Sequence, residues 1–235
     1  MNRIAENLQD VTEKINSACR RAGRLPSEVT FVAVTKTVSA EICNTLYNLG
    51  CRNLAENRPQ TLWEKASQFS SNPTSPVRWH FIGHLQRNKS ARTLPFLHTL
   101  HSLDSLRLAE QLTKDLATFP PREEKLQVLL ELNITNDSTK TGLTPQDAQA
   151  ILQRYATEPS WQQLWNLSGL MGMSSLQATP SQIHAEFALL RSLRDQWQGD
   201  FGLQLPELSM GMSDDFEIAI EEGSTMVRIG SLLYR

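Results

Sequence analysis

A lysine at the end of an apolar run is the residue best placed for covalent chemistry. The run Thr30-Phe31-Val32-Ala33-Val34-Thr35 is rich in β-branched side chains and ends at Lys36, which is typical of a buried strand that opens onto a surface. A lysine amine in such a position can form an imine with a carbonyl compound. The alternative is a solvated lysine at a strand end, because most lysines are simply exposed.

Two loops near the carboxyl terminus contain the hydroxyl and glycine groups that phosphate sites use. They are Ser209-Met210-Gly211-Met212-Ser213-Asp214 and Gly230-Ser231. In barrels of alternating strands and helices, the loops after the last two strands often hold phosphate, together with the start of a helix. Ordinary capping by serine and glycine would place the same residues there, so both interpretations stay open.

A buried cation is predicted on the last strand. Arg228 lies two residues before Gly230, and side chains two apart on a strand share a face. We therefore expect the guanidinium to point into the barrel, where it needs an acceptor. A pyridine nitrogen would serve, and so would a carboxylate in a purely structural ion pair.

The remaining candidates favour structural roles. His80 and His84 share one face of a predicted strand and have no acidic residue close in sequence, so we expect packing or lining residues rather than metal ligands. Lys140 lies in the segment 137–142, which has too few glycines for a phosphate-cradling loop and is expected to be a turn. Four methionines suit either a packed core or an apolar wall beside a planar ring: Met171, Met173, Met210 and Met212.

Short apolar runs alternate with helical stretches along the chain. Residues 1–20 have apolar side chains at helical spacing, and later helices have start signals at Ser39, Thr144 and Thr179. These features predict an α/β fold, a single (β/α)8 TIM-type barrel preceded by an N-terminal helix, with an open doubly wound sheet as the alternative. The predicted strands are 30–36, 52–55, 79–83, 97–102, 126–133, 164–171, 207–210 and 225–230.

Composition narrows the class of protein. The 235 residues have a hydrophobic share of 40% and a formal net charge of -2, so residues 1–235 can form one domain and show no basic excess for nucleic acid or membranes. No apolar run is long enough to span a bilayer, and the start of the chain does not have a signal-peptide pattern. Three cysteines at irregular spacing favour a reducing, cytoplasmic location.

Six short motifs occur in an order that resembles the pyridoxal phosphate homeostasis protein family (YggS/PROSC type). The resemblance runs along nearly the whole chain, and each motif alone is weak. It implies a fold-type III barrel that binds pyridoxal 5'-phosphate (PLP), similar to the amino-terminal domain of bacterial alanine racemase. The motifs are Phe31-Val32-Ala33-Val34-Thr35-Lys36, Ala55-Glu56-Asn57-Arg58, Trp79-His80-Phe81-Ile82-Gly83-His84-Leu85-Gln86, Gly169-Leu170-Met171-Gly172-Met173, Ser209-Met210-Gly211-Met212-Ser213 and Met226-Val227-Arg228-Ile229-Gly230.

The resemblance also implies roles for individual residues. Lys36 matches the lysine that holds PLP as a covalent aldimine, Arg228 matches the arginine at the pyridine nitrogen, and Asn57 matches a residue beside the ring. Arg87, within Gln86-Arg87-Asn88-Lys89, is unusual for the family. The other predicted cofactor-binding residues comprise three matches to phosphate positions, Ser209, Gly230 and Ser231, with Ser174 and Met210 completing the set.

The same residues favour a carrier over an enzyme. An arginine at the pyridine nitrogen disfavours its protonation and weakens the ring as an electron sink. Racemisation needs a proton donor on each face of the substrate carbon, and Tyr47 and Tyr155 lie in predicted helices. Because the sequence ends at Tyr234-Arg235, we also expect the second β domain of alanine racemase to be missing.

We therefore expect a cytoplasmic monomer that buffers, protects or delivers PLP, with PLP-dependent apoenzymes as partners and effects on amino-acid and keto-acid balance. A PLP-dependent amino-acid racemase of weak activity is the alternative. A Schiff-base aldolase without PLP is a third hypothesis, because a strand-end lysine and a phosphate site would also serve a sugar phosphate.

Overall fold

Eight parallel strands close into a barrel in chain order. The computed structural model describes residues 2–69, 74–135 and 141–235, and its strands run β1-β2-β3-β4-β5-β6-β7-β8. Pairing of Thr30 with Met226 and of Ala33 with Ile229 joins the first strand to the last, which confirms the barrel and excludes the open sheet. The strands are β1 Thr30–Val34, β2 Asn53–Glu56, β3 Arg78–Phe81, β4 Leu97–Leu103, β5 Leu126–Glu131, β6 Trp165–Met171, β7 Glu207–Ser209 and β8 Met226–Ile229.

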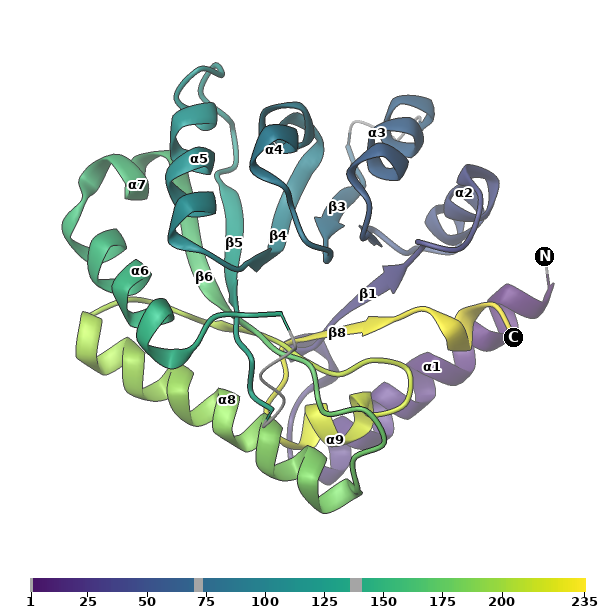
Figure 1. Cartoon of the computed structure of the whole chain (residues 1–235). Helices are drawn as coiled ribbons and strands as arrows, with labels where there is room; N and C mark the ends of the chain where they lie inside the picture. Colours follow the sequence, from purple (N-terminus) through teal and green to yellow (C-terminus); the bar gives the residue numbers. More distant parts are fainter. Residues whose placement is uncertain (1, 70–73, 136–140) are drawn as a thin grey trace.

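Helices surround the barrel (Figure 1). The predicted N-terminal helix is confirmed as α1, which packs against α9. The α-helices are α1 Asn2–Arg21, α2 Ala40–Asn48, α3 Pro59–Gln68, α4 Arg87–Thr93, α5 Leu106–Leu116, α6 Pro145–Thr157, α7 Pro159–Leu164, α8 Pro180–Phe201 and α9 Phe216–Glu221, with short 3-10 helices η1 Pro26–Glu28, η2 Leu94–Phe96 and η3 Ser231–Leu233.

Local sequence signals account for several helix starts. Thr144 accepts a hydrogen bond from the amide of Asp147 at the start of α6. Thr179 and Gln182 form a reciprocal capping box at the start of α8. Ser39 precedes α2 as predicted, although its side chain makes no capping hydrogen bond. Capping residues in the sequence therefore identified these starts correctly.

The core lies on both sides of the sheet, because the strands face helices outside and one another inside. Leu108, Leu112 and Leu116 form the buried stripe of α5, and Leu97–Leu103 is buried at six of its seven positions. The three cysteines are buried and free. A sheet covered on both faces explains the apolar runs that predicted its strands.

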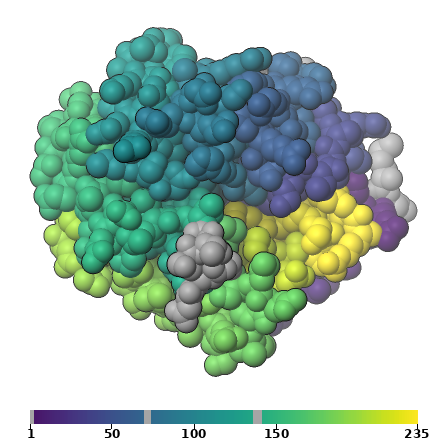
Figure 2. Space-filling model, viewed as in Figure 1, coloured from purple at the N-terminus to yellow at the C-terminus, as the bar shows by residue number. Residues whose placement is uncertain are grey.

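The two ends of the chain meet on the barrel surface. The side-chain Nδ2 of Asn7 donates to the carbonyl oxygens of Leu233 and Arg235, at 3.1 and 3.0 Å. Figure 2 shows the yellow carboxyl-terminal segment against the purple and blue surface of the first part of the chain. Among the described helices, none is long and apolar enough to cross a membrane.

Candidate functional site

A pocket of about 320 Å³ lies at the carboxyl ends of the strands. This volume is at the lower end of the roughly 300–1,000 Å³ of small-molecule sites. Each lining segment directly follows or ends a strand, which is where barrels place functional groups. The lining residues are Val34, Lys36, Asn57, Ile82, Gly83, Met171, Met173, Met212, Ser213, Asp214, Arg228, Gly230 and Ser231.

The structure brings together five of the eight residues predicted from sequence. Lys36, Asn57, Arg228, Gly230 and Ser231 all line this pocket. Strand β1 ends at Val34, so Lys36 lies two residues beyond it and is exposed rather than embedded in the strand. The lysine predicted to do covalent chemistry is therefore accessible from solvent.

The other three predicted residues lie behind the pocket wall. Ser174 is buried and donates to Asp215 Oδ2 at 2.6 Å. Ser209 and Met210 are fully buried, Ser209 beside Arg228 and Met210 in the hydrophobic core. Their placement supports the pocket from below and gives no support to a direct phosphate contact by Ser209.

A serine missed as an individual candidate lines the pocket instead. Ser213 lies four residues beyond Ser209, and its Oγ accepts a hydrogen bond from the Gly230 amide at 3.3 Å. This bond joins the loops that follow β7 and β8. The sequence indicated this loop but not which of its serines lines the pocket, since Ser209 ends β7 and is buried beside Arg228.

Gly211 allows this loop to turn. Its φ is 94°, and a Cβ there would lie 2.5 Å from the Ala219 Cβ and 2.9 Å from the Phe216 Cα. Only glycine combines a positive φ with so close an approach. The Asp215 carboxylate accepts from the Met212 amide at 2.6 Å and fixes the same turn.

Arg228 is the buried cation that the strand pattern predicted. Its Nη1 donates to Ser209 Oγ at 2.6 Å and its Nη2 to the Gly172 carbonyl oxygen at 3.1 Å. These bonds use two of the five N–H donors of a guanidinium, so others remain for an acceptor in the pocket. Burial lowers the pKa of Arg228 to about 10, which leaves it charged at neutral pH.

A chain of hydrogen bonds runs from Arg228 through the barrel interior. Ser209 Oγ lies 2.8 Å from His101 Nδ1, His101 Nε2 lies 2.8 Å from His80 Nδ1, and His80 Nε2 lies 3.1 Å from Asn53 Oδ1. Arginine only donates and the Asn53 oxygen only accepts. Each hydroxyl and ring N–H along the chain therefore points away from Arg228, with both histidines neutral.

These buried histidines make the free energy of unfolding depend on pH. Burial first, and the charges of His98 and Arg78 next, lower the pKa of His80 from 6.5 to about 3. The pKa of His101 is also lowered, first by burial. In the unfolded protein His80 and His101 bind protons near pH 6.5, whereas in the folded protein they stay neutral at that pH. The stability that is present above pH 6.5 is therefore lost as the pH falls.

We expect the free energy of unfolding to drop below pH 6.5 by about 1.4 kcal/mol per pH unit for each excluded proton. His101→Gln keeps one donor and one acceptor but removes one titrating ring, so its slope should be smaller by one proton. Urea unfolding between pH 7 and 5 measures both slopes. Equal slopes for the two proteins would contradict neutral burial of His101.

A buried ion pair lies directly behind Lys36 and Asn57. Lys65 Nζ donates to Glu56 Oε1 at 2.6 Å and to the Thr35 carbonyl oxygen at 2.7 Å. The Thr35 hydroxyl donates to the same Glu56 oxygen at 2.5 Å. Because Thr35 precedes Lys36 and Glu56 precedes Asn57, this cluster ties together the two backbone segments that present the pocket residues.

The histidine prediction is corrected in one respect. His84 does have an acidic partner, since its Nδ1 lies 2.5 Å from Asp104 Oδ2, but the aspartate comes from the end of the next strand. Within residues 2–69, 74–135 and 141–235, no three His, Cys, Asp or Glu side chains form a metal site. Lys140 lies outside the described residues.

Comparison with known proteins agrees with this arrangement. The sequence profile of the family "Alanine racemase, N-terminal domain" matches residues 5–235. The pyridoxal phosphate homeostasis protein of Aquifex aeolicus is 37% identical over 229 residues, covering 97% of this chain and 96% of that protein. The Escherichia coli K12 protein of the same name is 34% identical over 238 residues, covering 100% and 97%.

Solved structures show the same fold. PipY of Synechococcus elongatus, determined with PLP bound, has a TM-score of 0.84 and 30% identity and covers 99% of this chain and 100% of its own. Alanine racemase of Clostridium difficile has a TM-score of 0.76 at 15% identity, and the match covers 100% of this chain and 56% of the racemase. The racemase likeness concerns the barrel alone. With matches along its whole length, this chain belongs to the pyridoxal phosphate homeostasis protein family.

Proposed function

We propose that this protein binds PLP covalently through Lys36 and buffers, protects or delivers it inside the cell. The observation that carries the proposal is a buried arginine, Arg228, with spare N–H donors beneath the same pocket that presents the Lys36 amine. Relatives named for PLP homeostasis, and PipY with PLP bound, support the same assignment.

The donor set of the pocket fits the three functional groups of PLP. Lys36 offers an amine for the aldehyde, and Arg228 offers N–H groups for the pyridine nitrogen. Ser213 and Ser231 offer hydroxyls for the phosphate, and the Gly230 amide holds the Ser213 hydroxyl beside them. Met171 and Met173, with Met212, add a soft apolar wall for the ring.

When bound, PLP supplies an aldehyde that captures amines and a ring that accepts electrons. Arg228 is a cation, and a cation beside the ring nitrogen keeps that nitrogen unprotonated, so the ring is a weaker electron sink. The buried Ser209 and His101 hold the guanidinium in place. The chain's own residues thus hold the cofactor in a less reactive state, as a carrier requires.

The tyrosines also favour a carrier. Tyr47 and Tyr155 lie in α2 and α6 and donate to the carbonyl oxygens of Ser75 and Trp165. The Tyr234 hydroxyl donates to the Val34 carbonyl oxygen at 3.0 Å, and burial raises its pKa. Among the described residues that line the pocket there is no tyrosine to act as the second proton donor that a racemase needs.

An absorbance spectrum of the purified protein tests the proposal. We expect a band between about 300 and 500 nm that shifts on borohydride reduction, with the reduced adduct mapping to Lys36 by mass spectrometry. A featureless spectrum that persists after PLP is added would contradict PLP binding and favour the aldolase hypothesis. Steady turnover of D- or L-alanine that depends on Lys36 would favour the racemase.

The close approach at Gly83 predicts a further sensitivity of PLP binding. A Cβ on Gly83 would lie 2.1 Å from the Asn57 carbonyl oxygen, so Gly83→Ala must displace the Asn57 backbone at the pocket wall. We expect weaker PLP binding and a loss of roughly 1–3 kcal/mol of stability. Spectroscopic PLP titration and urea unfolding measure the two effects.

Gly199 is the matched control for this substitution. It lies inside α8, and a Cβ there would meet nothing within 4 Å. Gly199→Ala should therefore stabilise the protein by about 0.5–1 kcal/mol and leave PLP affinity unchanged. Equal PLP affinities for the two variants would show that the Gly83 contact is irrelevant to the site.

A further inference from the structure

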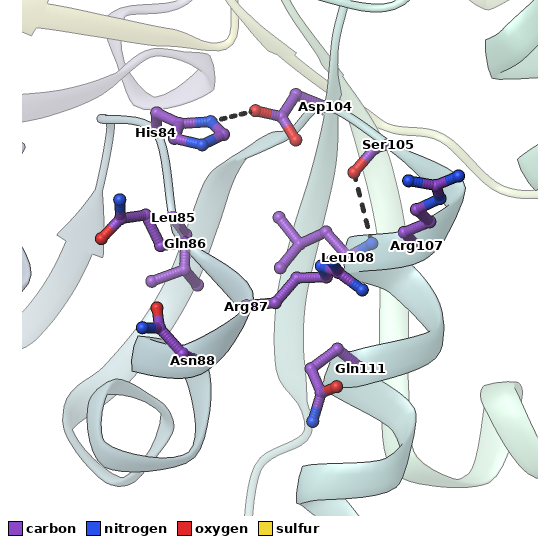
Figure 3. A pocket seen from close by; sticks show the side chains of 10 residues that line it. All are labelled: His84, Leu85, Gln86, Arg87, Asn88, Asp104, Ser105, Arg107, Leu108 and Gln111. Atoms are coloured by element: carbon purple, nitrogen blue, oxygen red, sulfur yellow. Dashed lines mark hydrogen bonds and ion pairs between the residues drawn. The ribbon is translucent and has the colours of Figure 1, made fainter.

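A second and larger cavity opens beside the Lys36 pocket. Its volume is about 700 Å³, and it lies between the β3–α4 and β4–α5 connections (Figure 3). Ile82 and Gly83 line the Lys36 pocket, and His84, the next residue, lines this cavity, so the two are neighbours. We call it the arginine cleft; its lining residues are His84, Leu85, Gln86, Arg87, Asn88, Asp104, Ser105, Arg107, Leu108 and Gln111.

Two arginines from different helices line the cleft. Arg87 begins α4 and Arg107 is the second residue of α5, and Figure 3 shows Arg87 reaching from α4 toward α5. Both are exposed, and neither makes a hydrogen bond or an ion pair with another described residue. Arg92, also on α4, instead lies 4.1 Å from the centre of the Trp63 ring.

The acid that lines the cleft is already engaged. Asp104 Oδ2 lies 2.5 Å from His84 Nδ1, and the aspartate side chain is only 12% exposed. The remaining polar lining groups are neutral, among them Asn88, Ser105 and Gln111. Among the described residues that line the cleft, the charged groups left without a partner are therefore the two guanidinium groups.

The segment that leads into the cleft is also positively charged. Residues 65–103 contain five Lys and Arg residues and no Asp or Glu, in a chain whose net charge is -2. Lys65 and Arg78 are paired with Glu56 and Glu124, and Asp115 of α5 accepts hydrogen bonds from Ser90 and Gln111. Among the described residues, the cations of this segment that have no acidic partner are therefore on α4. Such a concentration of one charge attracts anions to this side of the barrel mouth.

We propose that the arginine cleft binds the phosphate group of a phosphate monoester without a covalent bond. Guanidinium groups match phosphate geometry and hold it through paired, charge-assisted hydrogen bonds, and the cavity has room for a ring beside the phosphate. This inference rests on the proposed function. The occupant is PLP itself, held next to Lys36 before it binds there or after it is released.

Calorimetry on the loaded protein tests this site. The Lys36 site is first filled with PLP and made permanent with borohydride, and the protein is then titrated with PLP, inorganic phosphate or pyridoxal. We expect one further saturable event with PLP, a weaker one with inorganic phosphate and none with pyridoxal. Arg87→Ala and Arg107→Ala should each weaken it about tenfold or more, whereas Arg92→Ala is the matched control and should not.

Each outcome decides a specific point. Absence of a second binding event, or an event that Arg87→Ala and Arg107→Ala leave unchanged, would overturn phosphate binding by the arginine cleft. Equal affinities for PLP and inorganic phosphate would overturn PLP as the occupant. The Lys36→Ala protein titrated with inorganic phosphate should still show the event, so failure of covalent PLP binding and failure of the cleft are separate results.

Discussion

Replacing Lys36 by alanine should abolish the covalent attachment of PLP. Among the described residues that line the pocket, Lys36 is the lysine, so its loss leaves that lining with the reversible contacts of the phosphate loops and Arg228. We expect the variant to lose its cofactor on dialysis and to show no borohydride-stable label at position 36. Because Lys36 is exposed, the free energy of unfolding should change by less than about 0.5 kcal/mol.

The matched control is Lys14→Ala, which removes an exposed lysine from α1. This variant should keep the wild-type spectrum, the same yield of reduced adduct and the same unfolding curve. An unchanged yield of adduct in the Lys36→Ala protein would mean that another lysine forms the bond. Peptide mapping of that adduct would identify it.

Replacing Lys65 by methionine should cause the largest loss of stability. The side chain of Glu56 is fully buried, and its Oε2 already has no hydrogen-bond partner in the part of the chain that the structure describes. Removing the Lys65 ammonium leaves a buried carboxylate without its counterion, which costs about 3–5 kcal/mol. Urea unfolding at neutral pH measures the loss.

The double variant Glu56→Met, Lys65→Met separates stability from positioning. It removes both charges, so most of the lost stability should return. PLP affinity should stay weaker than in the wild type, because the cluster that ties Thr35 to Glu56 is still missing. Full recovery of PLP affinity in the double variant would show that the ion pair does not position Lys36 and Asn57.

Several features of the fold could be predicted from the sequence because their signals are local. Strands such as β5, Leu126–Glu131, are largely apolar and buried, and α6 and α8 begin at capping residues, Thr144 and Thr179. Lys36 and Arg228 were also predictable, since position at a strand end and two-residue periodicity are properties of neighbouring residues.

Other features came only from the tertiary structure. Ser209 contacts His101, which lies 108 residues away in sequence, and its hydroxyl also accepts from Arg228. The acid partner of His84, Asp104, directly follows the next strand, β4. The Lys65–Glu56 pair joins a helix to a strand. The sequence showed Arg87 only as an unusual residue, and the structure places it in the lining of the arginine cleft.

The physical reason is the distance along the chain over which each interaction acts. Backbone propensity, periodicity and capping are decided within a few residues, so the sequence by itself determined the order of strands and helices and the lysine at the mouth. Which polar side chains meet inside a closed barrel depends on register and closure, which bring the carboxyl ends of distant strands together. Only the tertiary structure could therefore decide the partners of Arg228, Glu56 and His84.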